Sequence, residues 1–455
     1  MARTTRIFCV STLYGAATLA AALDAGLFEP TDRRLLVVLN TAATPEITPS
    51  VDTMPGFDRI RERFDEVVSW NEAIAPFHPS GWSPRGDDIP LWERYVRLLW
   101  NLGDDEVRLV VESIQVNPSL AVCQIFTGAP VDVYADGLMS YGPTRNKIDP
   151  LVGTRIDRLL HLDLVPGLTP LLLTEFGVPP VLVPTEAFLK VLGELAEEER
   201  ELTAPERRPA LLLGQYLSAL DIIGDAEEER LHLDMVRGAV ALGHTSIVFK
   251  PHPLAPARWS RLLEEEARKL GADLTLLERP VLAEVACLRL RPALVAGCFS
   301  TALFTAAGFH GLPVARTGTE SVLAALTPYQ NSNRVPLTIV DALLPDLADR
   351  AAVEGWAMPS RERVAELSAL LRAVGFAMQP QIHPGLRGEA ERFLSAHLDQ
   401  RTWRYFKRRR LASLALPGAV PAQLAFIPRN AAVRRLARRA RAMKRAATKR
   451  AAAKR

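Results

Sequence analysis

The sequence predicts an α/β fold made of two parallel-sheet domains that face each other across a cleft, with a basic helical tail at the C-terminus. Three observations support this prediction. Short apolar runs of strand length alternate with segments of helical periodicity in both halves of the chain. A charged stretch from Leu192 to Pro209 separates the halves and has the composition of a linker. Finally, 455 residues are too many for one ordinary hydrophobic core.

The first half opens as strand, helix and strand, which is the start of a doubly wound domain. The strands that we predict are 6–10, 34–40, 131–137 and 179–184, with a further apolar run at 106–111, and the helices are 16–25, 57–68 and 91–101. Residues 119–126 fit either a helix or a strand.

The second half restarts the same alternation. Its predicted strands are 210–215, 246–250, 274–277, 294–297 and 314–316, and its helices are 227–242, 258–270, 283–288 and 300–309. We therefore expect two Rossmann-like domains, a helical C-terminal region with a helix at 389–400, and a basic tail. The expected boundaries are 1–195, 209–385, 386–428 and 429–455.

The composition indicates a cytoplasmic protein. Apolar residues make up 48% of the chain and charged residues 24%, and no run reaches the ~18 apolar residues that a transmembrane helix needs. Polar Ser11, Thr12 and Tyr14 interrupt the apolar N-terminal stretch, so a strand and a turn fit it better than a signal peptide. The four cysteines form no C-x-x-C pair, so we expect neither a zinc site nor a disulfide framework.

The net charge of +3 conceals a basic tail on an acidic body. Arg429–Arg455 contains twelve Lys or Arg and no acid, whereas the rest of the chain carries 43 basic and 52 acidic residues, a net charge of −9. A second basic cluster, Arg404–Arg410, includes aromatic residues. Both segments fit contact with an anionic membrane, which would make the protein peripheral at the inner face of the cytoplasmic membrane. The alternative is a packed helix followed by a disordered tail, and we expect no specific nucleic-acid partner.

The first candidate site is the segment Ser246–Pro253. An apolar run ends there in Lys250-Pro251-His252-Pro253, and a strand must stop at this point because proline cannot donate a ladder hydrogen bond. Ligands of open α/β sheets bind beyond the carboxyl ends of strands, so His252 is well placed for chemistry. The alternative is an exposed turn histidine.

The second candidate site is Gly297–Ala302, where Ser300 and Thr301 open a predicted helix directly after a strand. Unpaired backbone N–H groups and the helix dipole favour an anion at such a point, which suggests a phosphate site. The alternative is that one of the two hydroxyls only caps the helix.

The third candidate site is Tyr134-Ala135-Asp136-Gly137, where Asp136 can project a carboxylate into the cleft from the first half. The alternative is an ordinary turn residue before glycine. The paired acids Asp87-Asp88 and Asp104-Asp105 lie in polar loops, so we expect no metal site, and the G-x-G-x-x-G fingerprint is absent.

Together these places resemble the bacterial sialyltransferases and polysialyltransferases that use CMP-sialic acid. That family carries an acidic-acidic-Gly motif, a His-Pro motif and a Ser-Ser or Ser-Thr pair in this order, and the resemblance spans roughly residues 6 to 320. The matching residues are Ala135-Asp136-Gly137, His252-Pro253 and Ser300-Thr301, with Glu284 resembling a ribose-binding glutamate and Phe8–Tyr14 the first strand and turn.

The resemblance implies a GT-B fold and an inverting transfer without a metal ion or a further cofactor. A carboxylate takes the proton from the acceptor hydroxyl, and His252 and the paired hydroxyls hold and neutralise the departing CMP phosphate. The residues expected to bind the donor are Lys250, Pro253, Glu284, Ser300 and Thr301.

The sequence departs from the family at Ala135, which occupies the first acidic position, where the base usually stands. We prefer Asp136 as the base. Because neighbouring side chains on a strand point to opposite faces, the strand must end before Asp136 for this assignment to work.

The main functional prediction is therefore transfer of sialic acid from CMP-sialic acid to a surface glycan. Both polysialic acid and a lipid-linked glycan fit this prediction as the acceptor. Two alternatives stay open. One is a CDP-glycerol or CMP-Kdo dependent transferase. The other is a non-catalytic nucleotide- or glycan-binding protein, because of Ala135.

Overall fold

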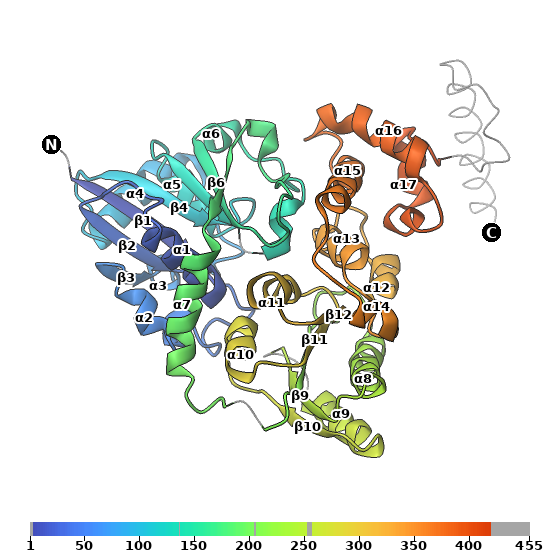
Figure 1. The fold of residues 1–455 in the computed structure, drawn as a ribbon. Coiled ribbons are helices and arrows are strands. Elements are labelled where there is room, and N and C mark those ends of the chain that lie inside the picture. The colour runs from blue at the N-terminus through green and yellow to red at the C-terminus, as the bar shows by residue number, and fades with distance from the viewer. Residues whose placement is uncertain (1–2, 136, 204–205, 253–256, 420–455) are drawn as a thin grey trace, which may run out of the picture. The chain divides into compact units, whose positions relative to one another are not determined.

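The computed structural model describes residues 3–135, 137–203, 206–252 and 257–419. The chain divides into two compact units, residues 1–390 and residues 391–455, and both sheets belong to the first unit (Figure 1). Among the described residues, no helix is both long and apolar enough to cross a membrane.

The first sheet has seven parallel strands in the order β3-β2-β1-β4-β5-β6-β7. Its strands are β1 (Thr4–Val10), β2 (Arg33–Val38), β3 (Glu66–Ser69), β4 (Glu106–Glu112), β5 (Val131–Ala135), β6 (Ile156–Leu162) and β7 (Pro180–Val183). The helices of this half are α1 (Leu13–Asp24), α2 (Phe57–Arg61), α3 (Trp70–Ile74), α4 (Ile89–Leu99), α5 (Ser119–Ile125), α6 (Pro150–Gly153) and α7 (Thr185–Glu198).

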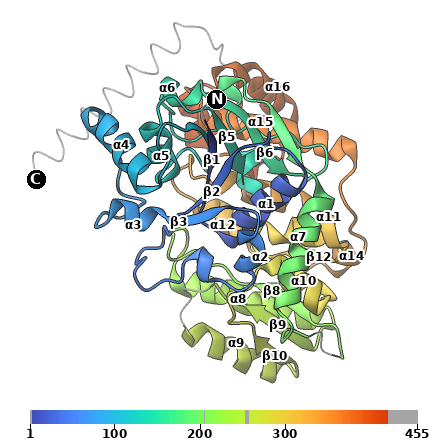
Figure 2. The same cartoon turned by 90° about the vertical axis from the view of Figure 1, so that its left-hand side faces the viewer.

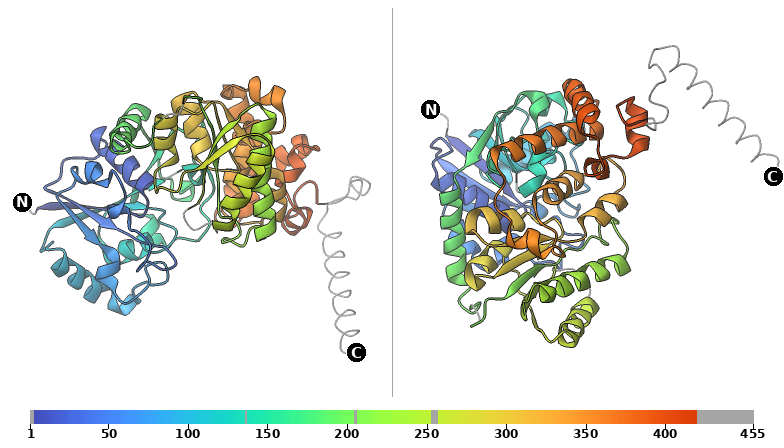
Figure 3. Two further views of the ribbon diagram at one scale, coloured as in Figure 1. Left: turned by 90° about the horizontal axis from the view of Figure 1, so that it is seen from below. Right: turned by 45° about the vertical axis from the view of Figure 1, so that its right-hand side comes forward.

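Both faces of this sheet are covered, which explains why its strands are apolar on both sides. On β1, Ile7 and Cys9 belong to a core cluster that includes Trp70 and Trp100. Phe8 is fully buried and lies edge-on to Phe28 on the other face, with ring centroids 5.2 Å apart. Figures 2 and 3 show helices on both sides of the strands.

The second sheet has five parallel strands in the order β10-β9-β8-β11-β12. Its strands are β8 (Ala210–Leu213), β9 (Ser246–Lys250), β10 (Asp273–Leu276), β11 (Leu294–Gly297) and β12 (Val314–Arg316). The helices that follow or connect them are α8 (Asp225–Ala241), α9 (Ala257–Lys269), α10 (Ala283–Leu290), α11 (Ala302–His310), α12 (Thr319–Ala325), α13 (Arg334–Leu343), α14 (Arg350–Glu354) and α15 (Arg361–Met378).

The prediction of a two-sheet α/β fold of the GT-B type is confirmed, because each half builds a parallel sheet with helical connections. The prediction of a helix over residues 57–68 is wrong for the second part of that range. The helix α2 ends at Arg61, and Glu66–Ser69 forms the edge strand β3, where two adjacent valines suit a pleated strand. The expected domain boundaries are not tested by the sheets alone and stay a prediction.

The C-terminal unit begins within α16 (Arg387–His397) and includes α17 (Arg408–Leu414). Tyr405 and Phe406 are buried, and the guanidinium of Arg408 lies 5.2 Å from the ring centre of Trp403. These aromatic rings therefore pack within the protein, while Arg408 and Arg409 are exposed. The basic tail Arg429–Arg455 lies outside the described residues.

Candidate functional site

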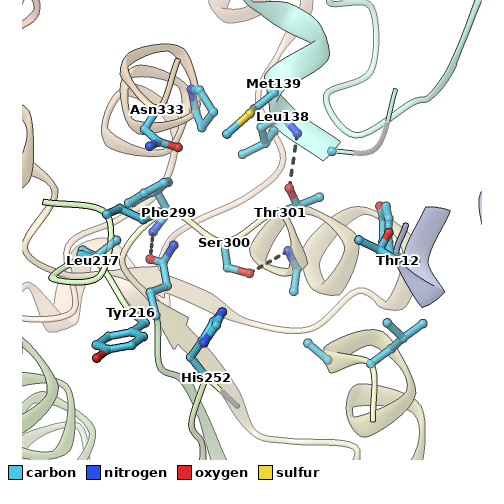
Figure 4. A pocket seen from close by; sticks show the side chains of 18 of the residues that line it. Thr12, Leu138, Met139, Tyr216, Leu217, His252, Phe299, Ser300, Thr301 and Asn333 are labelled. Atoms are coloured by element: carbon cyan, nitrogen blue, oxygen red, sulfur yellow. Dashed lines mark hydrogen bonds between the residues drawn. The ribbon is translucent and has the colours of Figure 1, made fainter. Parts of the chain in front are cut away.

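A cavity of about 690 Å³ gathers residues that follow strands of both sheets. Carboxyl ends of parallel strands are where α/β folds bind ligands. From the first half come Thr12, Tyr14, Gly137, Leu138 and Met139, and from the second half come Gln215, Tyr216, Leu217, His252, Glu284, Phe299, Ser300, Thr301 and Asn333, among others (Figure 4). We call this space the donor cavity, after the donor-binding role that the sequence predicts for Glu284, Ser300 and Thr301.

His252 reaches the donor cavity from the end of β9. The strand ends at Lys250, whose carbonyl accepts a hydrogen bond of 2.9 Å from Gly214 N. The imidazole lies beside the ring of Tyr216, with ring centroids 6.0 Å apart. Desolvation lowers the pKa of His252, and the positive charge of Lys250 lowers it further. A negatively charged ligand would act in the opposite direction.

Lys250 has a different position from His252. Of the described residues, those that line the donor cavity do not include Lys250. Its side chain is half-buried, burial lowers its pKa, and the nearby carboxylate of Glu284 counteracts this effect. Lys250 therefore affects His252 and Glu284 through its charge, and its predicted role in donor binding stays a prediction.

Ser300 and Thr301 lie in the cavity at the start of α11, but their hydroxyls have different partners. Ser300 Oγ accepts a hydrogen bond of 3.2 Å from Ala302 N, the first residue of the helix, whereas Thr301 is the N-cap residue and makes no capping hydrogen bond with its side chain. Thr301 Oγ1 accepts a hydrogen bond of 3.3 Å from Leu138 N of the first half. Within the described chain, the backbone N–H groups of Ser300 and Thr301 have no hydrogen-bond partner, which leaves two donors at the positive end of the helix.

A glycine is required at position 137, where the turn after β5 approaches Thr301 at the start of α11. Its φ of +83° is in the left-handed region, and a Cβ at this position would collide with the Thr301 hydroxyl. The turn after β5 and the start of α11 thus approach each other closely because residue 137 has no side chain.

Glu284 lies in the first turn of α10 and is only 4% exposed. Thr305 Oγ1 donates a hydrogen bond of 2.9 Å to Glu284 Oε1. Burial raises the pKa of this carboxyl group, and the charge of Lys250 partly opposes the shift. Glu284 thus presents a buried, oriented acceptor to the cavity.

Two predicted site residues, Asp136 and Pro253, lie outside the described residues. Their neighbours are described. Ala135 is the last described residue of β5, and the assignment of Asp136 as a base stays a prediction. Ala135 itself lines a separate cavity of about 50 Å³.

Several cavity residues were not predicted from the sequence. Gln215 and Tyr216 come after Gly214, the residue that follows β8, and Gln215 Oε1 accepts a hydrogen bond of 3.1 Å from Phe299 N. Their position after a buried strand was a usable signal. Asn333 precedes α13, a helix that we did not predict, and the sequence carried no signal for its role.

No group of three or more His, Cys, Asp or Glu side chains in the described part of the chain is placed to hold a metal ion. The metal-free reaction stays a prediction, because Asp136 is outside that part.

One of the comparisons with known proteins identifies a family. A family model described as alpha-2,8-polysialyltransferase (POLYST) matches residues 6–318. No curated protein matches the sequence. Among solved structures, the GT-B domain of a sialyltransferase from Photobacterium damselae is 12% identical, covers 74% of this chain and 96% of its own, and has a TM-score of 0.39.

Two further solved structures cover most of the chain at similarly low identity. UGT73P12 of Glycyrrhiza uralensis is 11% identical over 87% of this chain and 98% of its own, with a TM-score of 0.43. MurG of Acinetobacter baumannii is 10% identical over 84% of this chain and 98% of its own, with a TM-score of 0.40.

Proposed function

The chain belongs to the alpha-2,8-polysialyltransferase family, and we propose that it transfers sialic acid from CMP-sialic acid to a glycan hydroxyl with inversion and without a metal ion. Glycosyl transfer follows from the family, whereas the donor, the stereochemistry and the site residues are the proposal. The observation that carries it is one cavity that holds His252, Glu284 and the N-terminus of α11 opposite residues of the first half.

The phosphate of CMP fits the N-terminus of α11. There the N–H groups of Ser300 and Thr301, the Ser300 hydroxyl and the helix dipole all favour a negative charge. His252 faces the same cavity, and the negative charge of a phosphate there would raise its pKa and favour a protonated imidazole, with the proton taken from solvent. Glu284 would accept hydrogen bonds from the ribose hydroxyls.

The reaction is a single displacement at the anomeric carbon of sialic acid. The acceptor oxygen forms the new bond while the bond to the phosphate oxygen breaks, and the carboxylate of Asp136 takes the acceptor proton. The charge that develops on CMP is stabilised by His252 and α11. A monophosphate leaving group carries less charge than a pyrophosphate, so these groups can replace a cation.

We further propose that the acceptor is a surface glycan, lipid-linked or polysialic, and that the basic segments Arg404–Arg410 and Arg429–Arg455 bring the enzyme to an anionic membrane. The exposure of Arg408 and Arg409 supports the first segment.

A donor screen tests the proposal. CMP release is measured from CMP-sialic acid, CMP-Kdo and CDP-glycerol, with the wild type and His252→Ala. We expect release from CMP-sialic acid alone, reduced about 100-fold or more in the variant. The matched control is His244→Ala, because His244 precedes the same strand at its opposite end.

The screen also separates the alternatives. Turnover of CDP-glycerol or CMP-Kdo in place of CMP-sialic acid would favour another nucleotide-activated transferase. CMP binding without turnover of any donor would indicate a non-catalytic binding protein, which is the alternative that Ala135 raises.

A further inference from the structure

The helix α4 carries apolar side chains on two opposite sides. On its inner side, Val96 is fully buried and Trp92 packs against the hydrophobic core of the seven-stranded half. On its outer side, Leu91, Tyr95 and Leu98 are 67%, 40% and 69% exposed. A helix that is apolar all round is normally buried, so the outer side of α4 has the character of a contact surface.

The exposed residues of α4 form one stripe along the helix. Leu91, Tyr95 and Leu98 follow the spacing of four and then three residues that places side chains on one helical face. Leu99 and Arg94 are exposed beside them. We call these five residues the α4 stripe. Figure 2 shows α4 at the rim of the half that contains the seven-stranded sheet.

The charges around the α4 stripe favour a protein over a membrane as its partner. Arg97 Nε and Glu93 Oε1 form an ion pair at 2.9 Å, so these two residues add no net charge to the helix. Asp87 and Asp104 are exposed beyond its two ends. An anionic membrane on the stripe would meet both carboxylates, and like charges repel each other.

The α4 stripe is complementary to itself when two copies of the helix lie antiparallel. If Arg94 lies opposite Tyr95 of a second copy, the two-fold symmetry repeats this pair and places Leu91 of each copy opposite Leu98 of the other. Two leucines from each copy are then buried, and each guanidinium lies beside a tyrosine ring, which favours a cation–π contact. A parallel pair would instead place Arg94 against Arg94.

We propose that the α4 stripe is the contact surface between two copies of this chain, which pair by antiparallel packing of α4. The pairing does not depend on the donor or the acceptor of the transfer reaction. Each helix contributes 11 residues. Such a contact is smaller than the roughly 1,200–2,000 Å² that a stable complex buries, so we expect a weak dimer with a dissociation constant of about 10–100 μM.

Sedimentation of the full chain over a range of concentrations that brackets this constant tests the pairing. We expect a shift from monomer to dimer as the concentration rises. Leu98→Asp should raise the dissociation constant by about 100-fold or more, because the two-fold symmetry places the lost leucine and the added carboxylate in the contact twice. The matched control is Leu151→Asp. Leu151 is 78% exposed on α6, outside the stripe, and this variant should dimerise like the wild type.

Disulfide cross-linking tests the antiparallel register. The four native cysteines are buried, so cysteines placed on the stripe are the accessible ones. A mixture of the Leu91→Cys and Leu98→Cys proteins should cross-link in oxidised glutathione. Each protein alone should cross-link much less, because its two substituted positions are about 10 Å apart along the helix axis in an antiparallel pair.

Several results would overturn the pairing. A wild type that stays monomeric at every concentration contradicts it, and so does an equal loss of dimer in Leu98→Asp and Leu151→Asp. Cross-linking of Leu98→Cys with itself, in place of the mixed pair, would indicate a parallel contact and contradict the antiparallel arrangement. Binding of a monomeric chain to vesicles that Leu98→Asp abolishes would assign the α4 stripe to a membrane instead.

Discussion

His252 illustrates how the ligand sets the protonation state of a site residue. Its pKa is lowered by desolvation and by Lys250, so the imidazole is neutral near pH 7 in the free protein. A phosphate in the donor cavity places a negative charge nearby and raises that pKa again. The histidine can then become the cation that the departing CMP needs.

Proton uptake on CMP binding is the first prediction. At pH 7, calorimetric titration in two buffers of different ionisation enthalpy should show that the wild type takes up protons. Because the protonated histidine exists only below its pKa in the complex, CMP affinity should fall as the pH rises from 6 to 8. His252→Ala should abolish both effects, and a variant with unchanged proton uptake would contradict this role.

Glu284 should show a conflict between binding and stability. Because its pKa is raised in the folded protein, folding disfavours the ionised carboxylate. The free energy of unfolding therefore falls as the pH rises from the ordinary pKa of glutamate through the raised pKa of Glu284 in the folded state. Glu284→Gln should therefore raise the unfolding temperature at pH 8 more than at pH 5, while it weakens CMP binding. Thermal unfolding at both pH values and a CMP titration check this.

Glu228→Gln is the control, because its expected effect on the free energy of unfolding has the opposite sign. Glu228 is also buried, but its carboxylate accepts hydrogen bonds from Leu217 N and Ser218 N at 2.6 and 2.8 Å. Glu228→Gln should lower stability by about 1.5–3 kcal/mol, because the amide oxygen can accept only one of these two hydrogen bonds and the amide NH2 group faces the other N–H donor. A lower unfolding temperature in both variants would contradict the account of Glu284.

Among the site residues, the sequence located His252, Glu284, Ser300 and Thr301 in the donor cavity, because each follows a strand or opens a helix. It could not reveal that Thr301 bonds to Leu138, since that contact joins residues far apart in the chain. Such a partner depends on how the two halves pack, and local patterns carry no record of it.

At the scale of single elements, the strands 246–250, 294–297 and 314–316 are confirmed to the residue. Each is a short, buried, apolar run between breakers. Strand β6 was missed, because Asp157, Arg158 and His161 interrupt its apolar pattern. Arg158 of β6 forms an ion pair with Asp132 of the neighbouring strand β5. The partner of the Arg158 charge is therefore known only once the strands are paired in the folded protein.

The start of α11 should separate binding from turnover. Ser300→Ala removes a hydroxyl beside the phosphate site and should weaken CMP binding by roughly tenfold. Thr301→Val keeps the side-chain shape but leaves Leu138 N without its acceptor, so the turn that follows Asp136 is held less precisely. It should reduce the transfer rate more than CMP affinity. Equal effects of both variants on CMP affinity would contradict this division.

At the scale of the whole molecule, alternating strands and helices predicted two parallel sheets, and this is confirmed. The sequence did not predict α12–α15, although α13 packs against the turn at Gly137–Tyr141 and places Asn333 at the donor cavity. These helices follow the last predicted strand, where no strand pattern marks their place in the fold.

The tail prediction also concerns the whole molecule. Deleting Arg429–Arg455 removes twelve positive charges, each worth about 1 kcal/mol near an anionic surface. We expect the full chain to sediment with anionic vesicles in a salt-dependent manner and the shortened chain to sediment much less. Neutral phosphatidylcholine vesicles serve as the control. Unchanged sedimentation after the deletion would refute membrane contact by the tail.

The central claim is that one cavity, built by both halves of the chain, binds CMP with its phosphate at α11. A crystal structure of the full chain with CMP tests this most directly. We predict phosphate oxygens within hydrogen-bond distance of the Ser300 backbone N–H and the His252 ring, with the ribose hydroxyls at Glu284. CMP bound in another cavity, or in this one with its phosphate away from His252 and Ser300, would contradict the account.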